Sequence, residues 1–314
     1  MNYKSGVFFF GAELDNITKK SSPTSIQYSQ LKKKWGSDIS ELAPWTKISS
    51  SKEGTGGEYW ISGRDWEQPP IIIIDESSSI LDVAWHLYRS DLLTEGGSAL
   101  AVSQWAGRGQ FGRSWHSPVG NLYAAWRLPE ITKPWAEMLP LVVGYTIIQG
   151  LKAINKDIPF QLKWPNDLII KRKKVGGILI EGKNKATIAG IGINLITSPG
   201  EEGLTNPNAL SATSLNDFGF DLTPLSLWIK IIPAINSCFK KIIHSETPLR
   251  FISFLESCLA FMGEQVVVEG EEPSPYEGRI VGLNKKGYLQ VQTVSEEKII
   301  RSGRINLNPL LNNR

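Results

Sequence analysis

Three segments of the chain combine residue types that could hold a phosphate or a carboxylate and stabilise negative charge on it. The first extends from Gln104 to Trp115, and its glycines and arginines are Gly107, Arg108, Gly109, Gly112 and Arg113. Glycines let the backbone approach a ligand and point N–H groups at it, and a guanidinium matches a carboxylate or phosphate. Trp115 offers a flat ring on which a nucleobase could stack. The pattern predicts an anion-binding loop, with a plain surface loop as the alternative.

The second segment, Lys163-Trp-Pro-Asn-Asp167, places a lysine, an amide and a carboxylate within one short stretch. Pro165 fixes a turn, Asn166 offers both a donor and an acceptor, and Asp167 offers a carboxylate to a metal ion or an amine. A turn that only connects two elements could have the same composition. Taken alone, the segment does not decide between these two interpretations.

The third segment is Lys174-Val-Gly-Gly-Ile-Leu-Ile-Glu181, in which a lysine opens a predicted strand. Gly176 and Gly177 leave that strand bare enough for a ligand to lie against it. The basic run 171–174 is also compatible with a solvated hairpin tip or a nucleic-acid contact. A further strand with two glycines, Gly190-Ile-Gly-Ile-Asn194, follows downstream and ends in a polar side chain.

The elements that must position these segments include both helices and antiparallel hairpins. A β-branched run at 71–75 predicts a buried strand, and serines 77–79 before apolar residues at helical spacing predict a helix. The order of elements is α+β, with a mixed, mainly antiparallel sheet and flanking helices, rather than a repeating βαβ pattern. Further strands are expected at 98–104, 121–128, 160–163, 167–170, 175–181 and 186–195, and helices at 135–154, 223–243 and 248–261.

Changes in composition along the chain predict three parts. Residues 1–68 form an N-terminal segment of unknown role, in which no helix-turn-helix is evident. Residues 69–262 form the domain that carries the segments described above. Residues 263–314 form a small C-terminal β-barrel of SH3-like type, because short strands there are separated by turn signals. Its predicted strands are 265–269, 276–281, 287–293 and 298–302.

The composition excludes several classes of protein. The 314 residues are 41% hydrophobic and 21% charged, with a net charge of +3, which excludes extensive disorder. No apolar run reaches the roughly 18 residues that cross a bilayer, so we expect a cytoplasmic protein without a transmembrane helix. Cys238 and Cys258 cannot form a disulfide framework, and the three histidines lack metal-ligand or catalytic-triad spacing. A zinc enzyme and a serine hydrolase are therefore not expected.

In combination and in this order, the segments closely resemble those of biotin–protein ligases, the enzymes that attach biotin to a carrier lysine. The family pattern is Gly-Arg-Gly-Arg-x-Gly-Arg-x-Trp, Lys-Trp-Pro-Asn-Asp, Lys-x-x-Gly-Ile-Leu and Gly-Ile-Gly-Ile-Asn. The resemblance covers about residues 70–262, extends more loosely to the C-terminal part, and implies a biotin/lipoate ligase-like fold. It does not cover residues 1–68, where ligases that also act as repressors have a helix-turn-helix. The matching residues are 107–115, 163–167, 174–179 and 190–194.

The resemblance implies an ATP-dependent ligase with biotin and ATP as substrates, Mg²⁺ assisting, and biotinyl-5′-adenylate as the intermediate. A lysine of a biotin carboxyl carrier protein would accept the biotin. A homodimer fits the family, whereas membrane and DNA binding are not expected. The implied catalytic residues are Lys174, Arg108 and Asp167, with Asp167 also as the candidate Mg²⁺ ligand. The implied biotin-binding residues are Ser78, Ser79, Gln104, Gly107, Arg108, Gly109, Gln110, Lys174, Gly176 and Gly177. The implied ATP- and adenylate-binding residues are Arg108, Arg113, Trp115, Lys163, Asn166 and Asn194.

One position departs from the family pattern, because Gln110 stands where a second arginine is usual. In the family that arginine helps to retain the adenylate, and a glutamine keeps the hydrogen bonding but loses the charge. Losing a charged partner of a phosphate costs about 1.5–3 kcal/mol. We therefore expect an active enzyme that releases its intermediate more readily.

Three other functions are left open by the sequence. A lipoate or octanoate ligase has the same broad fold, although the Lys163–Asp167 segment favours biotin. A catalytically weak biotin-binding or regulatory homologue is suggested by Gln110 and by the unmatched residues 1–68. A nucleic-acid-binding module would rest on Lys171–Lys174 and the C-terminal part, but a net charge of +3 is small for that role.

Overall fold

The computed structural model describes residues 5–10, 35–49, 58–131, 133–183, 185–200, 210–270, 272 and 274–307. The chain divides into two units, and neither is a single continuous stretch of sequence. The chain crosses between them within strand β9 (Lys173–Lys183) and within helix α5 (Pro224–Ser245). The first unit consists of Met1–Glu130, Ile178–Thr197 and Leu215–Pro233, and the second of Ile131–Gly177, Ser198–Ser214 and Ala234–Arg314.

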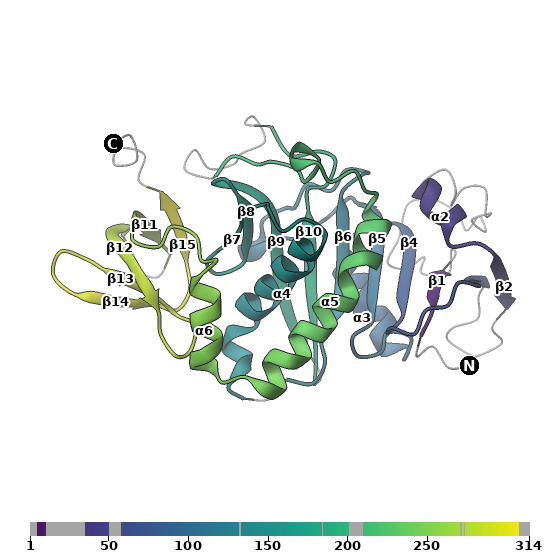
Figure 1. Cartoon of the computed structure of the whole chain (residues 1–314), viewed down its shortest axis with the longest axis horizontal. Coiled ribbons are helices and arrows are strands. Elements are labelled where there is room, and N and C mark those ends of the chain that lie inside the picture. The colour runs from purple at the N-terminus through teal and green to yellow at the C-terminus, as the bar shows by residue number, and fades with distance from the viewer. Residues whose placement is uncertain are drawn as a thin grey trace. The chain divides into compact units, whose positions relative to one another are not determined.

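The first unit contains a large, mainly antiparallel sheet (Figure 1). Its strands are β1 (Val7–Phe10), β2 (Trp45–Ser49), β3 (Glu58–Ser62), β4 (Ile71–Ser77), β5 (Ser98–Gln104), β6 (Leu122–Arg127), β10 (Ala186–Ile193) and part of β9. They lie in the order β2-β3-β1-β4-β5-β6-β10-β9. The pairs β1–β4 and β4–β5 are parallel, and β2–β3, β1–β3, β5–β6 and β6–β10 are antiparallel. This arrangement confirms the predicted α+β class.

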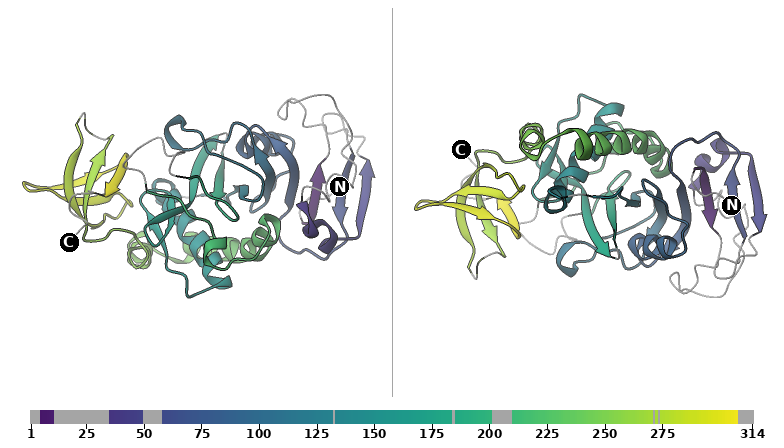
Figure 2. Two further views of the ribbon diagram at one scale, coloured as in Figure 1. Left: turned by 90° about the horizontal axis from the view of Figure 1, so that it is seen from above. Right: turned by 90° about the horizontal axis from the view of Figure 1, so that it is seen from below.

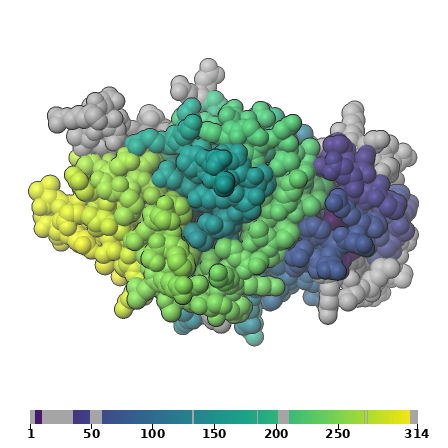
Figure 3. Space-filling model, in the orientation of Figure 1, coloured from purple at the N-terminus to yellow at the C-terminus, as the bar shows by residue number. Residues whose placement is uncertain are grey.

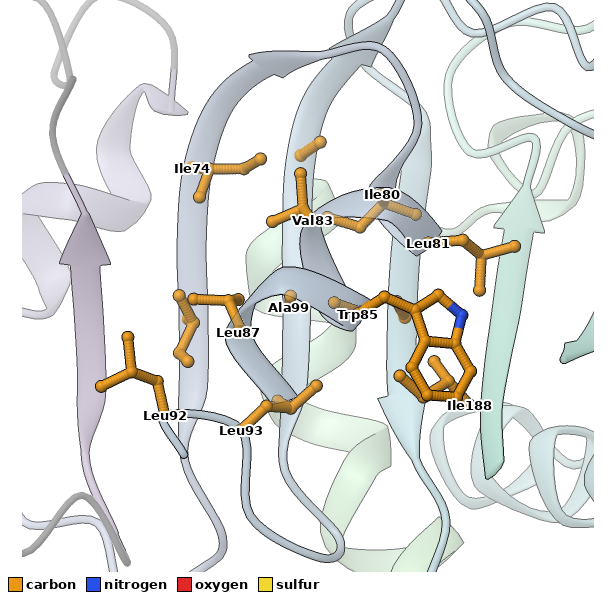
Figure 4. Close-up of a cluster of buried hydrophobic side chains, with 14 of the residues drawn as sticks. Ile74, Ile80, Leu81, Val83, Trp85, Leu87, Leu92, Leu93, Ala99 and Ile188 are labelled. Atoms are coloured by element: carbon orange, nitrogen blue, oxygen red, sulfur yellow. The ribbon is translucent and has the colours of Figure 1, made fainter. Parts of the chain in front are cut away.

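A buried cluster under helix α3 (Ile80–Arg89) holds this sheet together. The run Ile71–Ile74 is buried in β4, as a β-branched run covered on both faces should be. Figure 4 shows side chains of α3, among them Val83 and Trp85, in one cluster with Ala99 of β5 and Ile188 of β10. Each large apolar side chain buried in this way contributes about 1.5–3 kcal/mol. The cluster therefore fixes the ends of β4 and β5, from which the candidate site residues project.

The N-terminal segment contributes three strands that were not predicted from the sequence, together with the short helix α2 (Ser37–Glu41). Strand β1 lies between β3 and β4, with Phe8 in register with Ile72. These strands have at most five residues and pair with distant segments, so their local sequence carries little signal. Residues 11–34 and 50–57, on which the helix-turn-helix question partly depends, lie outside the described residues. The predicted division of the chain at residue 68 stays a prediction. Strand β1, before residue 68, pairs with β4, which follows it.

In the second unit, β7 (Phe160–Lys163) and β8 (Asp167–Ile170) continue antiparallel from the first part of β9, in the order β9-β8-β7. Both strands have the bounds predicted from the sequence. The helix predicted at 135–154 consists of a 3-10 turn, η3 (Trp135–Met138), and α4 (Leu139–Ile154), which contacts β7 and β8. The hairpin that carries Asp167 and Lys174 is thus supported by a long apolar helix.

The segment Trp135–Ile154 is long and apolar enough to cross a membrane by length and composition, with a mean hydropathy of 1.2. It reaches this length because the helix continues through Pro140 and Gly144, which interrupt the apolar run in the sequence. Of this segment's most apolar window, 61% is buried inside the protein. A helix that is covered by other parts of its own chain is a core helix, so we interpret Trp135–Ile154 as a core helix.

Helix α6 (Pro248–Glu256) is shorter than the helix predicted at 248–261. Thr247 caps its start by accepting a hydrogen bond from Arg250 N. Beyond its end the chain pairs with β7, because Leu162 N donates to Cys258 O at 2.8 Å and Ala260 N donates to Leu162 O at 2.9 Å. Pairing with a distant strand thus replaces the last helical turn.

The C-terminal residues of the second unit form a separate five-stranded antiparallel sheet (Figure 2). Its strands are β11 (Gln265–Glu269), β12 (Tyr276–Leu283), β13 (Leu289–Gln292), β14 (Glu297–Ile300) and β15 (Arg304–Leu307), in the order β14-β13-β12-β11-β15. The predicted small SH3-like β-domain is confirmed, although β15 was not predicted. Figure 3 shows C-terminal residues, coloured yellow, at the surface. Val294 and Ile299 of the β13–β14 hairpin are exposed.

Candidate active site

The glycine- and arginine-rich segment folds as a closed loop after β5. Gly109 N donates to the Arg113 carbonyl at 2.7 Å, and Trp115 N donates to the Gly107 carbonyl at 2.8 Å. A 3-10 turn, η2 (Gln110–Gly112), forms the tip, where Phe111 has φ 56° and a 62% exposed side chain. The segment is therefore a loop, as predicted, and its own hydrogen bonds fix its shape; its binding of an anion stays a prediction.

Gln104, the last residue of β5, uses its amide to fix the start of α3. Its Oε1 accepts a hydrogen bond from Ile80 N at 2.7 Å, and its Nε2 donates to Ser117 Oγ at 2.8 Å. Among the described residues Gln104 Nε2 donates to Ser117 alone, and because an amide has two N–H donors, the second can serve a ligand. Gly107 is required beside it, because a Cβ atom there would lie 2.6 Å from Ser117 Oγ and 3.0 Å from Gln104 Nε2.

The three consecutive serines at the end of β4 have different environments. Ser79 is buried at the N-cap of α3, and Ser78 Oγ donates to Asp82 Oδ2 at 3.4 Å. Ser77 is fully buried, pairs in register with Gln104, and its Oγ has no hydrogen-bond partner among the described residues. Ser77 is therefore a candidate ligand-binding residue that sequence reasoning missed. The pairing of the two strand ends is the signal that could have found it.

Two carboxylates hold the guanidinium of Arg108. Its Nη1 donates to both oxygens of Asp82 at 2.7 and 2.9 Å, and its Nη2 donates to Glu181 Oε1 at 3.2 Å. Partial burial lowers the pKa of Arg108, but the two carboxylates outweigh this effect and raise the pKa overall. Trp85 Nε1 donates to the other Glu181 oxygen at 2.7 Å. These acidic partners were missed because they are 26 and 73 residues away in the sequence.

The two glycines of β10 make room for neighbouring side chains. A Cβ atom at Gly192 would lie 2.6 Å from Nε1 of Trp115, so the indole packs directly on the strand. A Cβ atom at Gly190 would lie 2.9 Å from Leu81 of α3, which makes Gly190 part of the core packing. Asn194 follows the strand and is buried. The structure thus brings Trp115 against the Gly190–Asn194 segment.

Asn121 organises the backbone that follows Asn194. Its Oδ1 accepts hydrogen bonds from the backbone N–H groups of Leu195, Ile196 and Thr197 at 2.9, 3.0 and 3.1 Å. Its Nδ2 donates to Thr197 O at 2.9 Å. This positioning role could not be found by sequence spacing, because the partners are more than 70 residues apart.

In the second unit, Asp167 lies between two lysines. Lys174 Nζ is 2.6 Å from Asp167 Oδ1, and Lys163 Nζ is 3.4 Å from Asp167 Oδ2. The side chain of Asp167 is 16% exposed. Burial alone would raise its pKa, but the two ammonium groups outweigh burial and lower the pKa. Asp167 is therefore an anion that orients both cations.

The register of β8 and β9 places Lys174 and Asp167 on one face of the hairpin. Next to the two-residue turn, Ile169 pairs with Lys174. Lys174 therefore lies on the same face as Ile169, and on the same face as Asp167 two residues earlier in β8. Beyond this pair the extra residue Val175 forms a β-bulge and shifts the register, so that Gly177 lies opposite Asp167.

The remaining predicted residues of the second unit flank this pair. Asn166 is buried in the turn between β7 and β8. Trp164 in the same turn donates from Nε1 to Gly287 O at 3.0 Å, which anchors the turn. Gly176 and Gly177 follow the bulge on β9, opposite the start of β8.

The described residues do not favour a resident metal ion. Among them, no group of three or more histidine, cysteine, aspartate or glutamate side chains could hold one. Asp167 is the predicted Mg²⁺ ligand, but each of its carboxylate oxygens faces an ammonium group. Mg²⁺ needs oxygen ligands in near-octahedral geometry, so the arrangement fits a carboxylate that orients lysines better than a Mg²⁺ site.

The predicted site residues thus fall into two groups. Strand β9 contributes to both, because Lys174 stands near its start and Glu181, which holds Arg108, stands further along it. The first group offers amide and guanidinium donors, and the second offers two oriented ammonium groups. The first unit contains Ser78, Ser79, Gln104, Gly107, Arg108, Gly109, Gln110, Arg113, Trp115 and Asn194, and the second contains Lys163, Asn166, Asp167, Lys174, Gly176 and Gly177.

Comparisons with known sequences find that this chain is similar to ligases. The sequence model of the biotin/lipoate A/B protein ligase family matches residues 74–197. The bifunctional ligase/repressor BirA of Escherichia coli is 27% identical over 319 residues, covering 96% of this chain and 94% of the relative. BirA of Bacillus subtilis is 30% identical over 277 residues, covering 83% of this chain and 79% of the relative.

Comparisons with solved structures lead to the same group. A biotin protein ligase from Aquifex aeolicus, solved in complex with biotin and ATP, has a TM-score of 0.64 and 32% identity, covering 75% of this chain and 97% of that one. A biotin protein ligase from Leishmania major, solved with biotin, has a TM-score of 0.54 and 26% identity, covering 75% and 96%. The chain belongs to the biotin/lipoate A/B protein ligase family. Within that family its similarity is to the biotin protein ligases, as the sequence motifs predicted.

Proposed function

We propose that this chain is a biotin–protein ligase, which activates biotin with ATP and transfers it to a lysine of a biotin carboxyl carrier protein. The observation that carries the proposal is the 2.6 Å contact between Lys174 Nζ and the largely buried Asp167 carboxylate. It supports a cation held in place before the reaction, so that stabilising new negative charge needs little reorganisation. The similarity to ligases solved with biotin and ATP supports the choice of substrates.

In the first step, an oxygen of the biotin carboxylate attacks the α-phosphorus of ATP. The bond from that phosphorus to the oxygen bridging to the β-phosphate breaks, and pyrophosphate leaves. Lys174 stabilises the charge on the α-phosphate, and Asp167 holds Lys174 in position. Arg108 and the N–H groups of its loop hold the biotinyl-5′-adenylate, with Asp82 and Glu181 orienting the guanidinium.

The other site residues bind the two substrates. Ser77 joins the predicted serines as a ligand of biotin, and the two glycines after the bulge support its chain. The proposed biotin ligands are Ser77, Ser78, Ser79, Gln104, Gly107, Arg108, Gly109, Gln110, Lys174, Gly176 and Gly177. The proposed nucleotide ligands are Arg113, Trp115, Lys163, Asn166 and Asn194.

In the second step, the ε-amine of the carrier lysine attacks the carbonyl carbon of the mixed anhydride. An amide bond forms, the bond from that carbon to the AMP oxygen breaks, and the amine loses a proton to solvent. No covalent bond to the protein is needed in either step. The protein's contribution is to position the reactants and to shield the anhydride from water.

Several features extend the proposal. Mg²⁺ accompanies the ATP phosphates as part of the substrate, since Asp167 is occupied by lysines. We place the protein in the cytoplasm, as its apolar-run lengths predict, and expect a homodimer, as the resemblance to the family implies. The division into residues 1–68, 69–262 and 263–314 separates an N-terminal segment, the catalytic domain and the C-terminal β-domain.

A lipoate or octanoate ligase is the second candidate, because the matching family model includes lipoate ligases. The relatives that cover most of the chain favour biotin. Substrate choice therefore has to be tested directly, with biotin, lipoate and octanoate compared under the same conditions.

The test is ATP–pyrophosphate exchange by the purified protein with Mg²⁺. We expect exchange with biotin and little with lipoate or octanoate. Exchange with octanoate alone would establish the second candidate. Folded protein that binds biotin but exchanges nothing would establish a binding protein and end the ligase proposal.

A further inference from the structure

We propose that Arg172 is a positioning residue for Lys174 and acts through its ion pair with Glu264. The proposal rests on the proposed function, in which Lys174 stabilises charge on the α-phosphate. Arg172 lies in the turn between β8 and β9, two residues before Lys174. It belongs to residues 171–173 of the basic run, to which the motifs assigned no role.

The turn has an unfavourable backbone for its side chains. Lys171 and Arg172 have positive φ values of 45° and 66°. Two left-handed residues in a row are typical of a tight two-residue hairpin turn, in which asparagine and glycine are favoured. Long side chains at both positions weaken such a turn, so a contact outside the turn has to hold it.

Arg172 makes that contact with the segment between α6 and β11. Its Nη1 and Nη2 atoms each donate to one oxygen of the Glu264 carboxylate at 2.9 Å. Its guanidinium also lies 5.4 Å from the centre of the Phe261 ring. The Glu264 carbonyl accepts a hydrogen bond from Ile280 N of β12 at 3.1 Å. Because a two-point pair fixes direction as well as distance, the hairpin tip is attached to the C-terminal sheet.

Lys174 depends on the position of this tip because the bulge separates it from the regular part of the hairpin. Between the tip and the bulge at Val175, only Lys173 and Lys174 pair with β8. The backbone of Lys174 is also held by Ser211 O and Thr213 N, at 2.8 and 2.9 Å. A shift of the tip would turn Lys174 about these bonds and move Nζ. A displacement of about 1 Å can cost about 100-fold in rate.

A purely structural role would give a different result from a positioning role. The side chains of Arg172 and Glu264 are 47% and 30% exposed, and half-exposed pairs add little to stability. A positioning role predicts a loss in kcat with little change in unfolding. A structural role predicts a loss in unfolding stability without a specific loss in kcat.

The test measures biotin-dependent pyrophosphate exchange for Arg172→Gln, Glu264→Gln and the double variant. We expect kcat to fall about 3- to 30-fold, with KM for biotin and ATP changed less than about twofold. The double variant should lose no more than either single variant, because both remove one interaction. The reversed pair, Arg172→Glu with Glu264→Arg, should recover part of the rate. Unchanged kcat in the single variants, or additive losses in the double variant, would overturn the proposal.

Two controls separate the ion pair from the turn. Replacing Lys171 by Asn and Arg172 by Gly supplies favoured turn residues but removes the ion pair, so stability should be kept while kcat falls. Lys298→Gln removes another ion pair of the C-terminal sheet, with Glu272 at 2.6 Å, and should leave kcat unchanged. If the Asn-Gly variant kept the full kcat of the wild type, the turn conformation, and not the ion pair, would be what positions Lys174.

Peptide-resolved amide hydrogen exchange tests the same proposal without activity. Arg172→Gln should speed exchange in residues 168–176, and Lys298→Gln should not. Wild-type protein that binds biotin but lacks pyrophosphate exchange would contradict the proposed function. Equal hydrogen exchange in Arg172→Gln and wild type would contradict the positioning role, so the two failures can be told apart.

Discussion

Nζ of Lys174 lies 2.6 Å from Oδ1 of Asp167, and the two side chains share one face of the hairpin because Lys174 pairs with Ile169, two residues after Asp167. Residues opposite each other in an antiparallel pair lie on the same face, and so do residues i and i+2 of one strand. The register next to the turn thus creates the central charge pair of the candidate site.

Replacing Lys174 by alanine should abolish most of the first half-reaction. The variant loses the cation proposed to stabilise charge on the α-phosphate, so exchange should fall about 100- to 1000-fold. Biotin binding, measured by calorimetry, should weaken much less than exchange, because the other proposed biotin ligands remain. Exchange within about threefold of wild type would remove Lys174 from the reaction.

Replacing Asp167 by asparagine should change how stability depends on pH. The two lysines lower the folded-state pKa of Asp167 below its ordinary value of 3.8. Its charge therefore stabilises the folded protein above about pH 4, and this contribution is lost as pH falls through the lower folded pKa. Urea unfolding near neutral pH should show Asp167→Asn to be less stable by about 1–3 kcal/mol. The difference from wild type should shrink in acid, and a constant difference down to about pH 2 would contradict this assignment.

Replacing Gly192 by alanine should weaken ATP binding. The added Cβ would lie 2.6 Å from Nε1 of Trp115, so the indole proposed to receive adenine has to move. Losing a stacking surface costs about 1–3 kcal/mol, so KM for ATP should rise about 5- to 150-fold with biotin affinity unchanged. Gly182→Ala is the matched control, because its Cβ would meet only Thr187 Oγ1, at 3.9 Å.

Replacing Gln110 by arginine should slow the release of biotinyl-5′-adenylate. The change restores a charge that can pair with the phosphate, which is worth about 1.5–3 kcal/mol and so at least about tenfold in release rate. The measurement is the dissociation of radiolabelled adenylate from the preloaded protein. Release as fast as from the wild type would show that Gln110 does not limit retention.

The sequence was most informative where local patterns decide structure. Strands β5, β7, β8 and β11 have the predicted bounds, because their apolar runs are bounded by turn residues. The site motifs could be located for the same reason, since their glycines, arginines and lysines are local. The α+β class followed from the order of these elements.

The sequence was least informative where a partner lies far along the chain. Asp82 and Glu181 hold Arg108 from α3 and β9. Glu181 ends the Lys174–Glu181 segment, but its local sequence does not indicate that it pairs with Arg108. Strand β1 is too short to predict from its own residues and forms by pairing with β3 and β4. The bulge at Val175 is likewise a property of two paired strands, and no single strand shows it.

The interleaved path of the chain affects the order in which the protein can be completed during synthesis. Strand β6 pairs with β10, so Ala125 can pair with Gly190 only after the ribosome has made the later strand. Ser98 at the start of β5 is the hydrogen-bond partner of Trp228, which is made later still. A nascent chain that stops before β10 presents β6 as an open sheet edge, a site for wrong pairing with other chains. Truncation after Glu130 would therefore yield an aggregation-prone fragment, and the first unit becomes complete only when residue 233 has been added.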